Sequence, residues 1–201
     1  DPPRALPGME QKPVSSAPFS PELVSSFFMP SMSPQPTQAA APAAVMPDVL
    51  SLADVRKIAK SVIDKHFRGR VDPAMVTAMV EIESGFNRKA YRYEPRVFDG
   101  KSDASYGLMQ NLYRTNARWH YDERGKRAFA LNAPEDLYDP ATAIYFGAAT
   151  IDWLRSHSLF DGTEDWLVMA YNGGPGGVGG STTPNHLAKY KAAKARQAQV
   201  K

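Results

Sequence analysis

The sequence predicts a mainly α-helical protein, with one helical domain over residues 48–201 behind an extended, proline-rich segment over residues 1–47. Two observations lead to this expectation. Eleven of the 17 prolines fall within residues 1–47, where no periodic apolar pattern occurs. The rest of the chain repeatedly shows a helix-capping residue followed by proline or an acidic residue, each ahead of an apolar stripe with helical spacing.

The charge of the chain is divided unevenly. Residues 1–50 carry a net charge of −2, whereas the remaining 151 residues hold 22 basic and 17 acidic side chains, a net +5. A moderately basic domain suits an anionic polymer such as nucleic acid, lipid headgroups or cell wall. The absence of cysteine excludes disulfide and thiol chemistry. No apolar run approaches the roughly 18 residues of a membrane span, and a start at Asp1 without methionine indicates a processed or partial sequence.

Residues 1–47 form a low-complexity segment that cannot bury enough surface to fold alone. The segment nevertheless contains apolar side chains suited to the groove of another protein. We expect it to bind a protein partner, a component of a virion tail or a secretion machine, and a solvated linker is the alternative. The apolar residues in question are Phe19, Leu23, Phe27, Phe28 and Met29.

Two long amphipathic helices begin with clear capping signals. The first opens at Ser51, has Asp54 at the capping-box position and ends near Phe67. The other starts at Asp139-Pro140. The inward faces are expected to hold Leu52, Val55, Ile58, Ala59, Val62 and Ile63 in the first, and Ile144, Gly147, Ala148, Ile151 and Leu154 in the other.

A shorter helix between Asp72-Pro73 and Gly85 carries the most informative residue. At about 100° per residue, Glu83 falls on the apolar stripe of that helix, with Met75, Val76, Met79 and Val80. Burial and the negative end of the helix dipole should raise its pKa, giving a carboxylic acid still protonated near neutral pH. Glu81 falls on the opposite side, where a solvated glutamate is expected. A purely structural, paired Glu83 is the alternative.

Residues 86–106 are expected to form a loop with a short hairpin, and residues 115–120 a further helix. A helix capped by Thr163 should follow over residues 166–171, then a glycine-rich loop over residues 173–180. A last, basic helix is expected from Pro184 onward. The glycine-rich loop follows a helix and lacks the Lys-Ser/Thr of a nucleotide loop. The four histidines lie far apart and lack metal-binding spacing. We therefore expect no metal and no cofactor.

Three ordered motifs resemble the signature blocks of the soluble lytic transglycosylase (SLT) family, which has a lysozyme-like fold. They are Glu83-Ser-Gly-Phe-Asn87, Gly107-Leu-Met-Gln110 and Ala170-Tyr-Asn-Gly-Gly-Pro-Gly176. The resemblance covers roughly residues 70–180 and implies a lysozyme-like helical domain that cleaves peptidoglycan. The chain departs from the family pattern at Arg88, where proline is usual, and after Gln110. Its linker over residues 91–106 is longer and more similar to phage-borne relatives.

The resemblance implies that Glu83 is the sole acid/base catalyst. It would protonate the oxygen of the β-1,4 bond between N-acetylmuramic acid and N-acetylglucosamine, then remove the proton of the 6-hydroxyl. The product would be a 1,6-anhydro ring formed without water. One carboxylate suffices because the substrate supplies the attacking groups, as in other substrate-assisted exceptions to the two-carboxylate scheme.

The resemblance also implies substrate-binding roles for seven residues: Ser84, Ser105, Tyr106, Met109, Gln110, Tyr171 and Asn172. Met109 and Gln110 would line the cleft, and Tyr171 would place its hydroxyl near Glu83. Gly107 would permit close approach of the glycan. Whether Ser102 or Ser105 meets the N-acetyl group is left open.

Two other functions remain as alternatives. A hydrolytic muramidase would cut the same bond with a water oriented by Asp99 or Asp103. A non-catalytic wall-binding or structural virion protein would keep the site without the chemistry. In each case we expect an extracytoplasmic protein, in a virion tail or in the bacterial periplasm and cell wall, with peptidoglycan rather than nucleic acid as its partner.

Overall fold

The computed structural model describes residues 46–95, 102–114, 117 and 127–200. The chain divides into a segment Asp1–Ala43 and a compact unit Ala44–Lys201. The expected partner-binding residues at 19–29 lie outside the described residues, and so do Asp99 and all of the predicted helix at 115–120 except Ala117.

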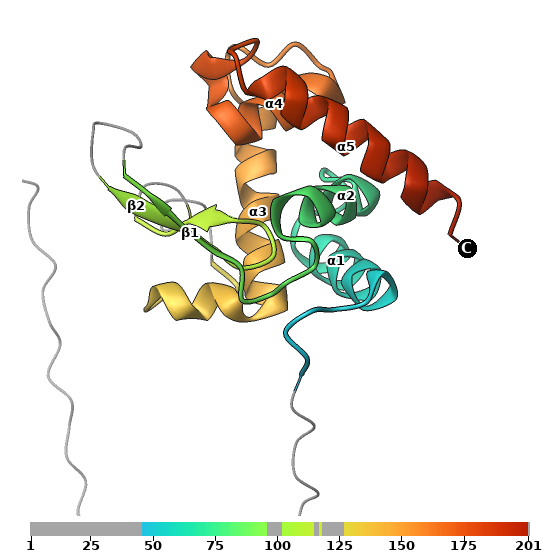
Figure 1. The fold of residues 1–201 in the computed structure, drawn as a ribbon, viewed down its shortest axis with the longest axis vertical. Helices are drawn as coiled ribbons and strands as arrows, with labels where there is room; N and C mark the ends of the chain where they lie inside the picture. The colour runs from blue at the N-terminus through green and yellow to red at the C-terminus, as the bar shows by residue number, and fades with distance from the viewer. Residues whose placement is uncertain (1–45, 96–101, 115–116, 118–126, 201) are drawn as a thin grey trace, which may run out of the picture. The chain divides into compact units, whose positions relative to one another are not determined.

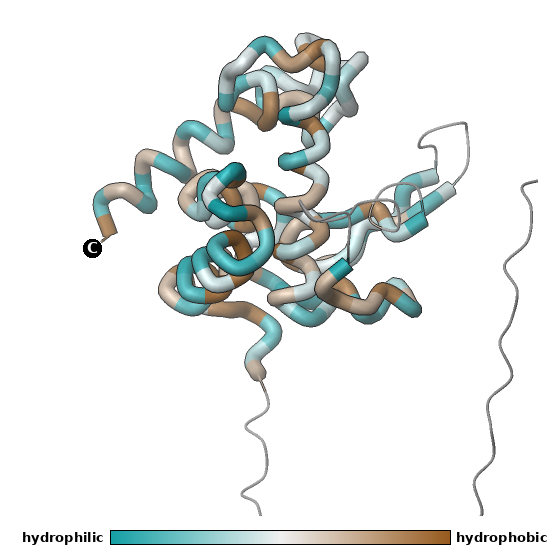
Figure 2. Tube along the Cα trace, turned by 180° about the vertical axis from the view of Figure 1, so that it is seen from behind, coloured by the Kyte–Doolittle hydropathy of each residue, from teal (hydrophilic) through white to brown (hydrophobic). Residues whose placement is uncertain are grey.

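The described domain is built around α3 (Pro140–Arg155), with α1 (Leu52–His66) and α2 (Pro73–Ser84) on one side and the strands on the other (Figure 1). The helix α4 (Glu164–Gly173) leads to α5 (Thr183–Ala198), which packs against both α4 and α2. The mainly helical prediction is confirmed. Figure 2 shows apolar segments, in brown, within these packed helices.

The predicted helix starts are confirmed by their caps. Ser51 accepts a hydrogen bond from the Asp54 amide at the start of α1, and Asp72 accepts one from Ala74 at the start of α2. Asp139 and Thr163 cap α3 and α4 in the same way. Such side-chain acceptors satisfy amides that have no partner within the helix. None of the described helices has the length and apolar character needed to cross a bilayer.

The short hairpin expected within residues 86–106 is confirmed and is part of a small antiparallel sheet. Strand β1 (Tyr91–Glu94) pairs with β2 (Asp103–Tyr106), and β2 pairs with the two-residue β3 (Asn111–Leu112). Arg92 lies opposite Ser105 and Tyr91 opposite Tyr106. Because successive side chains point to opposite faces of a strand, Arg92, Glu94 and Ser105 share one face, and the tyrosines share the other.

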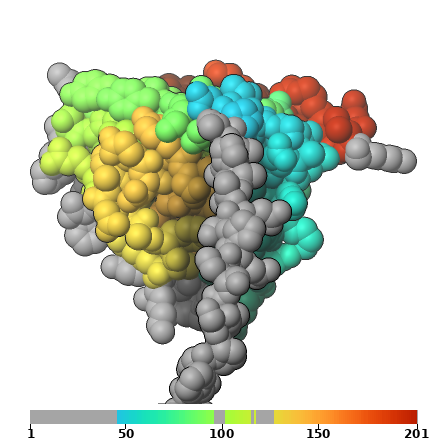
Figure 3. Space-filling model, turned by 90° about the horizontal axis from the view of Figure 1, so that it is seen from below, coloured from blue at the N-terminus to red at the C-terminus, as the bar shows by residue number. Residues whose placement is uncertain are grey.

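Arg88, which departs from the family motif, holds the beginning of the domain. Its guanidinium donates to the carbonyl oxygens of Met46 and Pro47 and to that of Tyr138, at 3.2, 3.0 and 3.4 Å. Its main-chain amide donates to Asp48 at 2.8 Å. Figure 3 shows the start of the described domain, in blue, against the green segment that follows α2. Met46 and Pro47, expected in the tail, are thus bonded to the domain.

Gly107 is required by the fold. Its φ of +72° is a left-handed conformation that favours glycine. A Cβ at this position would lie 1.9 Å from the carbonyl oxygen of Leu137, in the short helix η3 (Pro134–Tyr138). Glycine is therefore needed here for the close packing of η3, and an additional role in glycan approach stays a prediction.

Candidate active site

Glu83 lies in the last turn of α2, just before Gly85 ends the helix in a left-handed conformation. Its side chain is only 9% exposed. Burial raises the pKa of Glu83 from 4.5 to about 7, with the Arg92 charge lowering it and the Glu94 charge raising it. The expected buried acid with a raised pKa is confirmed. A carboxyl group with this pKa can both donate and accept a proton near neutral pH.

Glu81, two residues earlier, lies among hydrogen-bond donors and a positive charge that favour its ionised form. The expectation of an ordinary solvated side chain is therefore wrong. Its carboxylate pairs with Arg196 and accepts a hydrogen bond from Gln197 at 2.7 Å, both near the end of α5. Burial raises the pKa of Glu81, but the Arg196 and Gln197 hydrogen bonds and the Arg196 charge outweigh it, so the pKa is lowered. Glu81 joins α2 to α5.

One face of the hairpin presents a second carboxylate to Glu83. Glu94 Oε1 is paired with the Arg92 guanidinium and accepts a hydrogen bond from Ser105 Oγ at 3.2 Å. Ser105 is 2% exposed, so its hydroxyl is buried beside Glu94. The charges of Arg92 and Glu94 both act on Glu83. The sheet therefore brings an arginine, a carboxylate and a serine toward the buried acid.

His186, in the first turn of α5, contacts Glu83 directly. Its Nε2 lies 3.3 Å from Glu83 Oε1, and the two side chains are 11% and 9% exposed. Burial and the positive charges of Lys189 and Arg92 lower the pKa of His186 to about 4. The imidazole is therefore neutral at pH 7, and this contact joins a neutral ring to a carboxyl group rather than two ions.

The turn after β2 supplies main-chain groups more than side chains. Met109 is fully buried against Gly147, so its side chain packs in the core instead of lining a cleft. Gln110 has a left-handed backbone conformation, as Gly107 does, and its side-chain amide donates to the Gly107 carbonyl at 3.1 Å. Asn111 donates to the Ala143 carbonyl of α3 at 2.9 Å, which fixes the turn to the central helix.

Tyr171 on α4 donates its hydroxyl hydrogen to the Met109 carbonyl at 2.8 Å. Burial raises the pKa of Tyr171 well above 10, and the nearby charge of Glu83 raises it further. Asn172 is exposed and accepts a hydrogen bond from Thr182 at 3.4 Å. Ser84 donates back to the Val80 carbonyl of its own helix at 3.0 Å. Tyr171 is therefore near Glu83, but its hydrogen bond is to the turn.

Tyr106 is separated from this group. It packs edge-on against Tyr91 at 5.4 Å and against Tyr138 at 5.9 Å between ring centroids. Because Tyr106 is next to Ser105 on β2, it points to the other face of the hairpin. There it lines a hollow of about 330 Å³ together with Ser102. The two serines left open by the sequence thus lie in different places, and only Ser105 shares a face with Glu94.

Asp103 is unavailable to orient a water for hydrolysis. Its carboxylate accepts hydrogen bonds from the amides of Ala104 and Arg114, and the residue is 5% exposed. Within the described ranges no group of three or more histidine, aspartate or glutamate side chains is placed to hold a metal ion.

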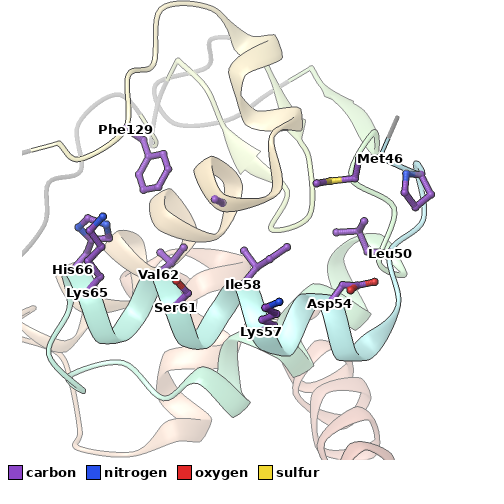
Figure 4. Close-up of a pocket in the computed structure, with 12 residues that line it drawn as sticks. Met46, Leu50, Asp54, Lys57, Ile58, Ser61, Val62, Lys65, His66 and Phe129 are labelled. Atoms are coloured by element: carbon purple, nitrogen blue, oxygen red, sulfur yellow. The ribbon is translucent and has the colours of Figure 1, made fainter. Parts of the chain in front are cut away.

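A separate hollow of about 540 Å³ runs along the side of α1 (Figure 4). Ile58, Val62, Leu50 and Phe129 contribute apolar groups, and Lys57 lies at its edge. None of the side chains around Glu83 lines it. The acid site and this hollow are therefore different features.

Comparison with known families agrees with this geometry. The Transglycosylase SLT domain family matches residues 60–193, about two thirds of the sequence. The chain belongs to this family. Among solved structures, the SLT domain is similar to the 70 kDa soluble lytic transglycosylase of Escherichia coli, with a TM-score of 0.53 and 19% sequence identity. The match covers 69% of this chain but only 23% of the E. coli chain. Comparison with curated proteins found no match.

Sequence reasoning missed two side chains of the SLT domain that act on Glu83, Glu94 through its charge and His186 through a direct contact. Glu94 and His186 lie outside the three motifs, and each reaches the site only through the pairing of β1 with β2 or the packing of α5 on α2. The alternation in Tyr91-Arg-Tyr-Glu94 was a usable signal, since it places both charged residues on one face of a strand. No sequence pattern pointed to His186.

Proposed function

We propose that this SLT domain is a peptidoglycan lytic transglycosylase that cleaves the β-1,4 bond between N-acetylmuramic acid and N-acetylglucosamine, with Glu83 as acid and base. The observation that carries the proposal is the buried Glu83 carboxyl, 9% exposed, whose pKa is raised to about 7. A group that is half protonated near neutral pH can donate a proton to the leaving oxygen and then accept one from the 6-hydroxyl.

The surrounding groups support this assignment of roles. The Arg92 guanidinium is a positive charge near the carboxylate that forms when Glu83 gives up its proton. Ser105 and Glu94 are candidates to receive the N-acetyl group and the sugar hydroxyls, because they present a hydroxyl and a carboxylate on the same face. Tyr171 and Gln110 hold the adjacent turn through main-chain carbonyls. Ser84 and Asn172 are secondary candidates for substrate binding, whereas the buried Met109 side chain and Tyr106 on the other face of the hairpin are not.

The test is digestion of purified peptidoglycan by wild type and Glu83→Gln, followed by mass spectrometry of the fragments. The amide is nearly the same shape but cannot act as an acid, so turnover should fall by a factor on the order of 10²–10⁴. Anhydro ends are lighter than reducing ends by one water. Glu81→Gln removes a charge from the same helix and serves as the control, which should remain active wherever it is folded. A Glu83→Gln protein within tenfold of wild type would contradict the proposal.

Hydrolysis of the same bond is the second candidate function, and Glu94 is the observation that favours it. This carboxylate, rather than Asp103, is the second acidic group whose charge acts on Glu83. A hydrolase of this kind uses a second carboxylate to activate water. Reducing ends in place of anhydro ends, lost on Glu94→Gln, would select hydrolysis.

We also propose that residues 1–47 carry the enzyme to a wall-crossing assembly, such as a virion tail or a periplasmic secretion machine. The support is the proline-rich sequence with its apolar residues, and the basic character of the rest of the chain. Removal of residues 1–45 should leave activity on soluble glycan fragments unchanged. A truncated protein that no longer folds would contradict the role of this segment as a docking region.

A further inference from the structure

We propose that His186 is a positioning residue for Glu83: its neutral imidazole donates the Nε2 hydrogen to Oε1 of the carboxyl group and leaves Oε2 to the substrate. The inference rests on the proposed acid/base role of Glu83. It adds to the three family motifs a residue that none of them contains.

The contact itself is direct and largely closed to water. Nε2 lies 3.3 Å from Oε1, with the side chains 11% and 9% exposed. Among the described residues Nε2 is buried and has no hydrogen-bonding partner, so at 3.3 Å from Oε1 its hydrogen is close to the carboxyl group but not aligned on it. A buried polar atom without a partner is costly, and hydrogen bonds at a catalytic group are often long or poorly aligned before substrate binds. The Glu83 carboxyl is the group that can satisfy this nitrogen.

The position of the imidazole is fixed by the start of α5. The His186 amide donates to the Thr182 carbonyl at 3.2 Å, and Thr182 in turn donates to Asn172 on α4 at 3.4 Å. Thr183 accepts from the Gly179 amide at 3.1 Å and donates to the Gly180 carbonyl at 3.2 Å. The glycine-rich segment after α4 therefore holds the first turn of α5, and this turn directs His186 at Glu83.

The charges around the pair keep the acidic proton on Glu83. Four groups face it from three elements: Arg92 and Glu94 on β1, Tyr171 on α4 and Lys189 on α5. Burial and the charges of Lys189 and Arg92 hold the pKa of His186 at about 4, below the value of about 7 for Glu83. A ring that remains neutral can donate a hydrogen bond without taking the proton that the reaction needs.

The hydrogen bond would then serve both halves of the reaction. In the first, the Oε2–H bond breaks, the proton passes to the glycosidic oxygen and the bond from that oxygen to C1 breaks with its electron pair. In the second, the 6-hydroxyl oxygen bonds to C1 and its proton returns to Oε2. His186 keeps its own proton throughout. Between the two halves its Nε2–H stabilises the carboxylate at Oε1.

The experiment compares His186→Leu with His186→Gln, whose amide nitrogen reaches the same distance from the backbone as Nε2. The pKa of Glu83 is followed by carbon NMR of labelled glutamate in the free protein, and kcat and KM are followed against pH on glycan fragments. Loss of the donor in His186→Leu should raise the pKa by about one unit. It should also lower kcat roughly tenfold, with KM unchanged. His186→Gln should restore both to near wild type.

The outcomes separate this inference from the proposed function. An unchanged or lowered Glu83 pKa in His186→Leu would overturn it, and so would equal loss of activity in both variants. If wild type fails to cleave peptidoglycan, the proposed function is wrong, yet the NMR titration still decides whether Nε2 donates to Glu83. Unfolding midpoints near wild type for both variants would exclude a merely structural role.

Discussion

Glu83→Gln should make the protein more stable at pH 8 than wild type, while removing its proposed activity. The carboxyl group is buried, and its pKa is raised from the ordinary value of 4.5 to about 7. The folded state therefore binds the proton more tightly than the unfolded state. The contribution of the Glu83 carboxyl group to the free energy of unfolding is fully present below about pH 4.5 and is lost as the pH rises through 7.

The size of the effect follows from the shift. A change from 4.5 to about 7 corresponds to about 3 kcal/mol lost from wild type at pH 8 relative to pH 4. The side chain is only 9% exposed, so solvent screening reduces this little. A glutamine side chain does not ionise, and its oxygen can accept the hydrogen bond proposed from His186. For a domain of this size the variant should melt about 6–12 °C higher than wild type at pH 8.

The assay is urea and thermal unfolding of both proteins at pH 5 and pH 8. Glu81→Gln is the matched control, because the pKa of Glu81 is lowered and its pair with Arg196 stabilises the fold above the unfolded pKa. That variant should be less stable than wild type at pH 8, and the difference should shrink as the pH falls. A stability difference between Glu83→Gln and wild type that does not grow from pH 5 to pH 8 would refute this prediction.

Three further predictions concern the turn, its glycine and the surface charge. Tyr171→Phe removes the donor to the Met109 carbonyl, so the free energy of unfolding in urea should fall by about 1–3 kcal/mol, and turnover should fall with it. An unchanged unfolding free energy together with unchanged turnover would contradict the role of this hydrogen bond. Gly107→Ala should cost at least about 2 kcal/mol, since its Cβ meets the Leu137 carbonyl at positive φ, and a wild-type melting temperature would refute this. Binding to purified wall should weaken from low to high salt, because residues 51–201 carry a net +5 charge, and a flat salt profile would remove the electrostatic contribution.

The helices could be predicted closely because their signals are local. Ser51, Asp72, Asp139 and Thr163 each cap the helix that the sequence placed after them, and Gly85 ends α2 as expected. The raised pKa of Glu83 also follows from local information, namely its place on the apolar stripe of a short helix.

The surroundings of Glu83 depend on contacts between distant parts of the chain. Glu81 was expected in solvent because the apolar pattern of α2 gives no information on where α5 packs. In the structure, Arg196 and Gln197 of α5 cover the side of α2 that carries Glu81. The packing role of Gly107 was not foreseen for a similar reason, since the Leu137 carbonyl approaches it from η3. His186 entered the site through tertiary packing alone. Motifs located the acid, whereas packing determined its neighbours.

The attachment of α5 to α2 has a consequence for the order in which the protein becomes active during synthesis. Glu83 is made early, but the helix that contacts it at His186 and holds Glu81 at Arg196 is translated long afterward. A nascent chain that ends before α5 has the acid without its contact to His186 and without the helix that covers the Glu81 side of α2. The site is then incomplete until α5 docks. If Glu83 acts as proposed, such a chain should cleave peptidoglycan more slowly than the complete domain.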